Sequence, residues 1–174
     1  MPKVLECSRE QMLELARKRF LECGYATFTV RDLAKDCGVS VGTIYTYFSS
    51  KEALLTEAMV EEWRKLMRKV QEAASKFPDR DTGFRFLYEE IYSFNEKYHG
   101  FCTRRNRSEK ECEEGDEMHR AQLRQIASAV RQIAGLTDGE ENLSLFIADA
   151  FLSSCNRGIR DYGELAPFIR RLCE

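Results

Sequence analysis

Helical spacing of apolar residues is the feature that most restricts the fold of this chain. Between Ser50 and Lys76 the apolar residues form one stripe at helical spacing, and no glycine or proline interrupts it. At 1.5 Å per residue this segment would be a rod of roughly 40 Å. The chain shows no internal repeat and no succession of alternating strand patterns. We therefore expect an all-α fold.

Capping signals predict shorter helices ahead of this rod. Ser8 and Gln11 fit a capping box that starts the first helix, and Gly24 is suited to end it. A second, very short helix is expected to begin at the Thr29 cap and to end at Gly38.

A third short helix is predicted directly after the second. Ser40 can cap it, and Ile44 and Phe48 then point inward. Ser49 with Glu52 fits a further capping box, which would start the long rod.

Two more helical regions are expected beyond the rod. Apolar residues from Phe84 to Tyr98 recur at helical spacing, and Gly100 is expected to close that helix. Residues 103–117 change from basic to acidic without an apolar stripe, which predicts a surface loop or a partly disordered link. Helix is expected again from about Met118.

The C-terminal part predicts helices that are buried on two sides. Asp138 with Glu141 supplies a cap, and the segment 143–155, LSLFIADAFLSSC, is apolar or small nearly all the way round. Together with residues 164–174 it is expected to form half of an isologous four-helix dimer interface. The residues assigned to this interface are Phe146, Ala150, Phe151, Ser154, Arg157, Leu165, Phe168, Ile169 and Leu172.

Composition narrows the function classes. The formal net charge of −2 gives no general attraction to a polyanion, so any DNA binding must depend on local geometry. The 7 cysteines include no CxxC pair, which favours reduced thiols over a disulfide framework or a zinc ribbon. No signal-peptide core or bilayer-spanning apolar run occurs, and we expect a cytoplasmic protein that does not enter a membrane.

Two short capped helices around the turn DCGVS, residues 36–40, are typical of a helix-turn-helix whose second helix enters the major groove. Gly42 would let the backbone come close to DNA, while Thr43 and Thr46 are small hydrogen-bond donors. The phenols of Tyr45 and Tyr47 can reach phosphates or base edges. Lys51 and the free N–H groups at the start of the rod can hold a phosphate together.

Residues Thr29–Leu55, TVRDLAKDCGVSVGTIYTYFSSKEALL, preceded by FLECGYATFTV, resemble the TetR family of bacterial repressors. The resemblance implies a helix-turn-helix DNA-binding domain at 1–50 and a helical effector-binding and dimerisation domain at 51–174. It also implies a set of DNA contacts, to which the cap residue of the third helix is added. This set is Thr29, Tyr45, Tyr47 and Lys51 on phosphates, with Arg31, Ser40, Val41, Gly42, Thr43 and Thr46 toward the groove.

Val41 departs from the family pattern, because many members carry a basic residue at this position. A valine there can contact a thymine methyl group instead.

The aromatic residues between Phe84 and Tyr98 leave two interpretations open. They can line an apolar pocket for a small molecule, or they can be ordinary helical core. The resemblance favours an effector of unknown identity and no cofactor. The residues assigned to the pocket are Trp63, Leu66, Phe84, Leu87, Tyr88, Ile91, Tyr92 and Phe94.

A thiol- or metal-responsive sensor is the alternative. His99, Cys102, Cys112 and His119 are the set that could bind a metal, but gaps of two, nine and six residues between them are poor zinc spacing. We therefore assign no metal ligands. Cys102 and Cys112 can alternatively form a redox pair.

Catalysis is not expected. The chain has 2 histidines and lacks a GxSxG motif, a P-loop, an HExxH motif and a dinucleotide fingerprint. We expect a regulator that binds a pseudo-palindromic operator as a homodimer, usually represses transcription, and is released by a small molecule. The long rod is the expected lever between effector and DNA.

Overall fold

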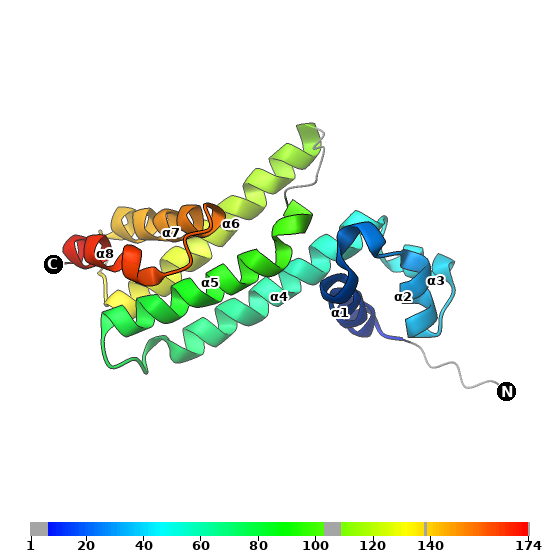
Figure 1. Cartoon of the computed structure of the whole chain (residues 1–174), viewed down its shortest axis with the longest axis horizontal. Helices are drawn as coiled ribbons and strands as arrows, with labels where there is room; N and C mark the ends of the chain where they lie inside the picture. The colour runs from blue at the N-terminus through cyan, green and yellow to red at the C-terminus, as the bar shows by residue number, and fades with distance from the viewer. Residues whose placement is uncertain (1–6, 103–108, 138, 174) are drawn as a thin grey trace. The chain divides into compact units, whose positions relative to one another are not determined.

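Helices account for every regular element in the part of the chain that the structure describes (Figure 1). This computed structural model describes residues 7–102, 109–137 and 139–173, with the backbone alone over 99–102 and 109–116. The predicted all-α fold is confirmed. The helices are α1 (Arg9–Thr27), α2 (Val30–Cys37), α3 (Val41–Tyr47), α4 (Lys51–Ala74), α5 (Arg80–Cys102), α6 (Glu109–Ala134), α7 (Glu141–Asn156), the 3-10 helix η1 (Tyr162–Glu164) and α8 (Ala166–Leu172).

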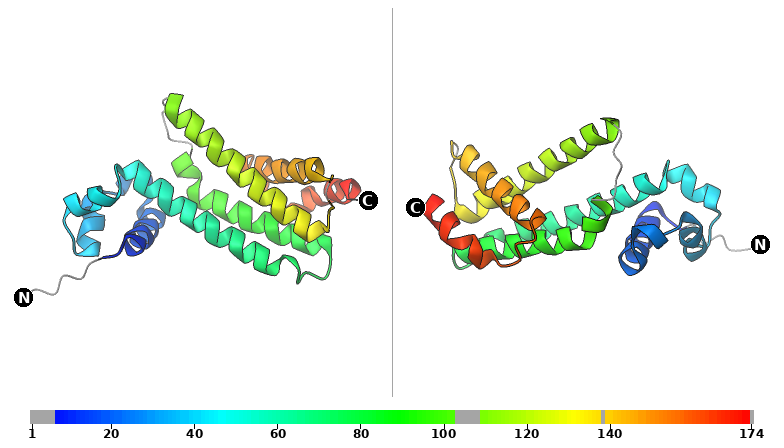
Figure 2. Two further views of the ribbon diagram at one scale, coloured as in Figure 1. Left: turned by 180° about the vertical axis from the view of Figure 1, so that it is seen from behind. Right: turned by 45° about the horizontal axis from the view of Figure 1, so that its top comes forward.

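The chain divides into two compact units, Met1–Arg64 and Lys65–Glu174. The first unit holds α1, α2, α3 and the first part of α4. In the second unit α5, α6 and α7 pack on one another, as both views of Figure 2 show. The domain boundary predicted after residue 50 stays a prediction.

The predicted caps of the first unit are present. Ser8 Oγ accepts from the Gln11 N–H at 3.2 Å, and the Ser8 N–H donates to Gln11 Oε1 at 2.7 Å. Thr29 Oγ1 caps α2 by accepting from the Asp32 N–H at 3.1 Å. Gly24 interrupts the helical geometry of α1 with φ 73°, a left-handed conformation that glycine adopts without a Cβ penalty.

The cap of α4 differs from the prediction. Ser50 Oγ accepts from the Ala53 N–H at 3.0 Å, so Ser50 is the cap and the predicted capping box of Ser49 with Glu52 is wrong. Phe48 is extended and buried, and this fixes where the chain can turn into the next helix.

Helices α5 and α6 are both longer than predicted. Helix α5 continues past Gly100 to Cys102, because one glycine costs a helix only about 1 kcal/mol. Helix α6 begins at Glu109 rather than near Met118, so most of the predicted loop is helical. Glutamate and lysine are strong helix formers, and acidic residues are favourable in a first turn, so no apolar stripe is needed there.

Aromatic rings from three elements, α5, α7 and η1, meet in the core of the second unit. Phe151 of α7 lies 6.1 Å from Phe84, 5.4 Å from Tyr88 and 6.1 Å from Tyr162 between ring centroids, in edge-to-face arrangements. Tyr88 Oη donates to the Ile159 carbonyl at 2.5 Å, which satisfies the hydroxyl of a fully buried ring.

The connection between α6 and α7 has its own local contact. Glu140 Oε2 accepts from the Thr137 N–H at 2.8 Å, and α7 begins at Glu141. The predicted cap residue Asp138 lies outside the described residues.

Candidate nucleic-acid interface

The turn between α2 and α3 is fixed by a glycine and a cap. Gly38 has φ 67°, and its N–H donates to the Lys35 carbonyl at 3.2 Å. Ser40 Oγ then accepts from the Thr43 N–H at 3.0 Å and starts α3. The helix-turn-helix that the sequence predicts is therefore present.

Helix α3 has one buried side and one exposed side. Ile44 is 1% exposed, and Phe48 directly after the helix is also buried. On the other side Val41, Tyr45 and Tyr47 are 36%, 48% and 49% exposed. Exposed apolar and aromatic groups that neighbour one another are a common feature of interaction surfaces. The exposed residues belong to the set assigned to DNA, and their contact with DNA itself stays a prediction.

Gly42 is not required by packing within the chain. A Cβ built on it would meet only Ser40 Oγ, at 3.6 Å, which is ordinary van der Waals contact. Its φ is not positive, so an alanine would fit the helix. The missing side chain therefore matters only for what approaches α3 from outside.

Two hydroxyl groups assigned to the DNA interface use their protons inside the protein. Thr46 Oγ1 donates to the Gly42 carbonyl at 3.0 Å, and Thr29 Oγ1 donates to Asp32 Oδ2 at 2.6 Å. In this arrangement the Thr46 oxygen can accept a hydrogen bond from a base amino group but cannot donate one.

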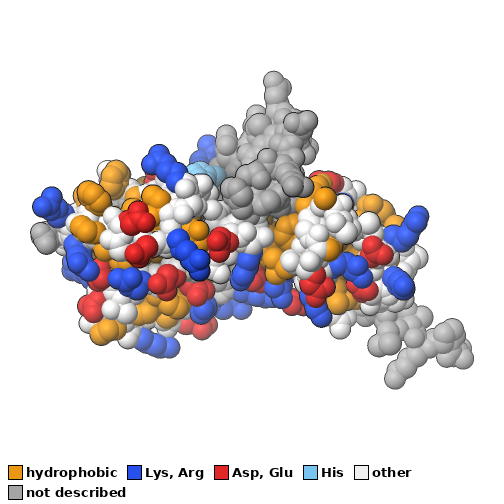
Figure 3. Space-filling view, viewed as in Figure 1, with side chains coloured by type: hydrophobic (Ala, Val, Ile, Leu, Met, Phe, Trp, Pro, Cys, Tyr) orange, Lys and Arg blue, Asp and Glu red, His pale blue; other side chains and the backbone are white. Residues whose placement is uncertain are grey.

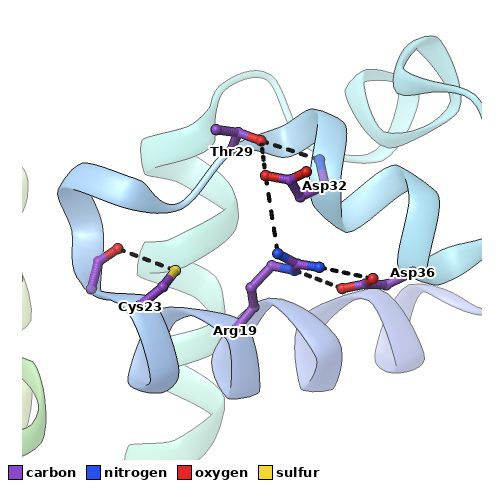
Figure 4. Close-up of polar contacts among 6 residues, drawn as sticks. Arg19, Cys23, Thr29, Asp32 and Asp36 are labelled. Atoms are coloured by element: carbon purple, nitrogen blue, oxygen red, sulfur yellow. Dashed lines mark hydrogen bonds and ion pairs between the residues drawn. The ribbon is translucent and has the colours of Figure 1, made fainter.

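Arg19 fixes α2 on α1 (Figure 4). Its Nε and Nη2 donate to the two carboxylate oxygens of Asp36 at 2.6 Å and 2.9 Å. This guanidinium holds the pKa of Asp36 below its usual range. Figure 4 also shows Arg19 directed toward Asp32, whose backbone and carboxylate both bond to Thr29. One network of hydrogen bonds and ion pairs therefore connects the start of α2 to α1.

Arg31 is exposed, whereas Lys51 at the start of α4 is half-buried. Lys51 Nζ donates to the Tyr25 carbonyl at 2.7 Å, and the Tyr25 hydroxyl donates to Glu52 Oε1 at 2.5 Å. The hydrogen bond from the Tyr25 hydroxyl lowers the pKa of Glu52. Sequence reasoning missed Tyr25 and Glu52, because no short-range pattern pairs residues so far apart in the chain.

The residues assigned to a ligand pocket are mostly core. Tyr88 and Ile91 are fully buried, and burial raises the pKa of the Tyr88 hydroxyl. Leu66 and Tyr92 are half-buried. Trp63 belongs to the first compact unit, and the other assigned residues belong to the second. Ligand binding by this set stays a prediction. The remaining members, all buried, are Trp63, Phe84, Leu87 and Phe94.

The residues assigned to a dimer interface divide by exposure. Phe146 and Phe168 are 60% and 68% exposed, and Figure 3 shows apolar side chains gathered at the surface over α7 and α8. Phe151, Ser154 and Ile169 are buried within the chain, and their assignment to the interface stays a prediction. The members that remain accessible are Phe146, Ala150, Arg157, Leu165, Phe168 and Leu172.

The side chains of His99, Cys102 and Cys112 lie outside the described part of the structure, and His119 is exposed. Among the side chains that are described, no three His, Cys, Asp or Glu residues gather as a metal site. None of the described helices is long and apolar enough to cross a membrane.

Residues 12–58 match the family model for bacterial regulatory proteins of the tetR family. YuxN, an uncharacterized HTH-type transcriptional regulator of Bacillus subtilis (strain 168), is 27% identical over 121 residues. That match covers 70% of this chain and 40% of YuxN, so this chain spans less than half of that relative's length.

Two solved structures share the fold over nearly the whole chain. A TetR/AcrR-family regulator from Thermobifida fusca has a TM-score of 0.59 at 19% identity, over 95% of each chain. FadR from Bacillus subtilis, in complex with stearoyl-CoA, has a TM-score of 0.56 at 18% identity, over 95% of this chain and 96% of FadR. Identities this low show the fold alone. The match of residues 12–58, which include α2 and α3, shows that this part of the chain is similar to the tetR family of bacterial regulatory proteins.

Proposed function

We propose that the chain is a transcriptional regulator that binds a pseudo-palindromic DNA operator as a homodimer and usually represses by occupying it. The exposed side of α3 carries the proposal, because Tyr45 and Tyr47 stand out from a helix whose opposite side is buried. The similarity to the tetR family model supports it, since the matched residues 12–58 include the whole helix-turn-helix.

A binding assay tests this proposal. The probe is a duplex that the wild-type protein selects from a random-sequence pool, titrated at several salt concentrations. Tyr47→Phe and Lys51→Ala should weaken binding, and Lys51→Ala should reduce the salt slope by about one for each phosphate that the ammonium no longer neutralises. Arg64→Ala is the matched control, because it removes an exposed cation of the same unit outside the helix-turn-helix. Unchanged affinity in both test variants would count against the proposed interface.

The surface over α7 and α8 supports the homodimer. Phe146 and Phe168 expose large aromatic areas, with Leu145 and Leu172 also exposed. Replacing Phe146 and Phe168 together by serine should convert a dimer to monomers in sedimentation. The matched control is Leu21→Ser, which changes an exposed apolar residue in the first unit. A wild-type chain that sediments as a monomer would remove this part of the proposal.

The effector proposal is that a small molecule prefers a dimer whose α3 helices are wrongly spaced for DNA, and so releases it. Since the FadR structure of similar fold holds stearoyl-CoA, a long-chain acyl-CoA is the first class to test. Stearoyl-CoA should raise the melting temperature and lower DNA affinity, whereas coenzyme A without the acyl chain should do neither. If stearoyl-CoA leaves both quantities unchanged, this class is excluded.

A further inference from the structure

Lys51 is held in place by Tyr25 at the start of α4. Its ammonium donates to the Tyr25 carbonyl at 2.7 Å and lies 4.2 Å from the centroid of the Tyr25 ring. The ring of Phe28, which is buried, lies 5.7 Å from the same ammonium. A flexible lysine side chain is thereby confined by one hydrogen bond and two aromatic rings.

The Tyr25 carbonyl and the rings of Tyr25 and Phe28 form a cradle for the Lys51 ammonium. The backbone at the end of α1 creates this cradle. Gly24 is left-handed, and the Phe28 N–H donates back to its carbonyl at 3.1 Å. This short closed turn presents the Tyr25 carbonyl and ring to the first residue of α4. An ammonium has three N–H donors, so the bond to Tyr25 leaves two for a phosphate.

The Glu52 carboxylate can compete with a DNA phosphate for the Lys51 ammonium, and Tyr25 also contacts this carboxylate. Its carboxylate follows Lys51 directly in the chain, accepts from the Tyr25 hydroxyl at 2.5 Å, and has a lowered pKa, so it is ionised. A loose carboxylate here would attract the Lys51 ammonium and repel a DNA phosphate. The Tyr25 hydroxyl fixes that carboxylate in a defined position.

We propose that Tyr25 is a positioning residue for the phosphate contact of Lys51, holding the ammonium with its carbonyl and ring while its hydroxyl restrains Glu52. The inference rests on the proposed DNA-binding function. It predicts that the Tyr25 hydroxyl contributes to DNA affinity only while Lys51 and the Glu52 carboxylate are both present.

Double-mutant cycles on the selected duplex test this dependence. Tyr25→Phe keeps the ring and the carbonyl, and it should weaken binding about three- to tenfold. The same change in a Lys51→Ala background should have no further effect, and Tyr25→Phe with Glu52→Gln should regain most of the original affinity. Glu61→Gln in the Tyr25→Phe background is the matched control, because it removes a carboxylate farther along α4 and should restore nothing.

The outcomes separate the inference from the proposed function. Equal losses on Tyr25→Phe with and without Lys51 would show a merely structural role and overturn the inference, as would wild-type affinity in Tyr25→Phe. Equal rescue by Glu61→Gln and Glu52→Gln would also overturn it, because net charge would then explain the effect. A wild-type protein that selects no duplex would overturn the proposed function itself. If Tyr25→Phe fails to fold, Tyr25→Leu replaces it, because it removes the hydroxyl and the ring but keeps the carbonyl; its loss of DNA affinity must likewise vanish in the Lys51→Ala background.

Discussion

Replacing Gly42 by alanine separates the needs of the folded chain from those of DNA binding. In the free protein the added methyl group would meet only Ser40 Oγ, at 3.6 Å, and the backbone is already helical. Alanine is favoured over glycine within a helix by about 0.5–1 kcal/mol. We therefore expect the variant to be as stable as the wild type or slightly more stable.

Bound to DNA, the same methyl group has the opposite effect. If the backbone of α3 lies against the duplex at Gly42, the methyl group must displace either the helix or the DNA. Overpacking a close contact costs about 1–3 kcal/mol, which is about 5- to 150-fold in affinity for each protomer. Fluorescence anisotropy on the selected duplex measures this weakening, and thermal unfolding of the same sample measures stability.

Gly38→Ala is the control, because here the added methyl group should lower the stability of the folded chain. No atom crowds a Cβ at Gly38, but its φ of 67° is left-handed, so alanine should cost about 1–2 kcal/mol of stability. An added methyl group thus stabilises at one position of the segment and destabilises at the other. Wild-type affinity in Gly42→Ala would refute the reasoning, because the backbone at Gly42 would then not lie at the DNA surface.

Three further predictions concern the scaffold. Gly83→Ala should destabilise by about 1–3 kcal/mol in chemical denaturation, because its Cβ would lie 2.5 Å from Ile133 Cγ2, and the same change should cost less in an Ile133→Ala background. Burial raises the pKa of the Cys155 thiol to about 12, so iodoacetamide at pH 8 should alkylate Cys155 only after unfolding, as mass spectrometry can check. In the folded protein Arg19 lowers the pKa of Asp36. The stabilisation that this ion pair gives should therefore be complete above the unfolded-state pKa of about 3.9 and should be lost as the pH falls through the lower folded-state pKa. Acid unfolding of Asp36→Asn should lack this pH-dependent loss of stability.

The sequence predicts well those features that depend on contacts between residues no more than four positions apart. The Ser8, Thr29 and Ser40 caps each depend on an N–H three residues ahead, and Gly38 depends on its own φ. The cap of α4 could not be predicted this way, because two adjacent serines are chemically equal and the burial of the preceding residue chooses between them.

Contacts between distant residues could not be predicted from one sequence. Tyr25 and Glu52 are 27 residues apart, and only the folded turn at the end of α1 brings them together. The same holds for the ring of Tyr88 against Phe151, which periodicity marks as apolar without naming a neighbour. The sequence also could not predict which of these aromatic residues is exposed. Phe146 and Phe151 belong to the same apolar segment, but Phe146 is exposed and Phe151 is buried.

Helix α3 has no cation, since it reads VGTIYTY, and the chain carries a net charge of −2. Non-specific attraction to phosphates is therefore weak, and the affinity of the proposed interface must come from groups held in fixed positions. A backbone at Gly42 gains by close approach only if α3 is rigid, and one lysine is effective only if its ammonium is already in place. The bracing of α2 by Arg19 and the cradle of Lys51 supply that rigidity. Substitutions that loosen these supports should therefore weaken DNA binding without touching a DNA-facing side chain.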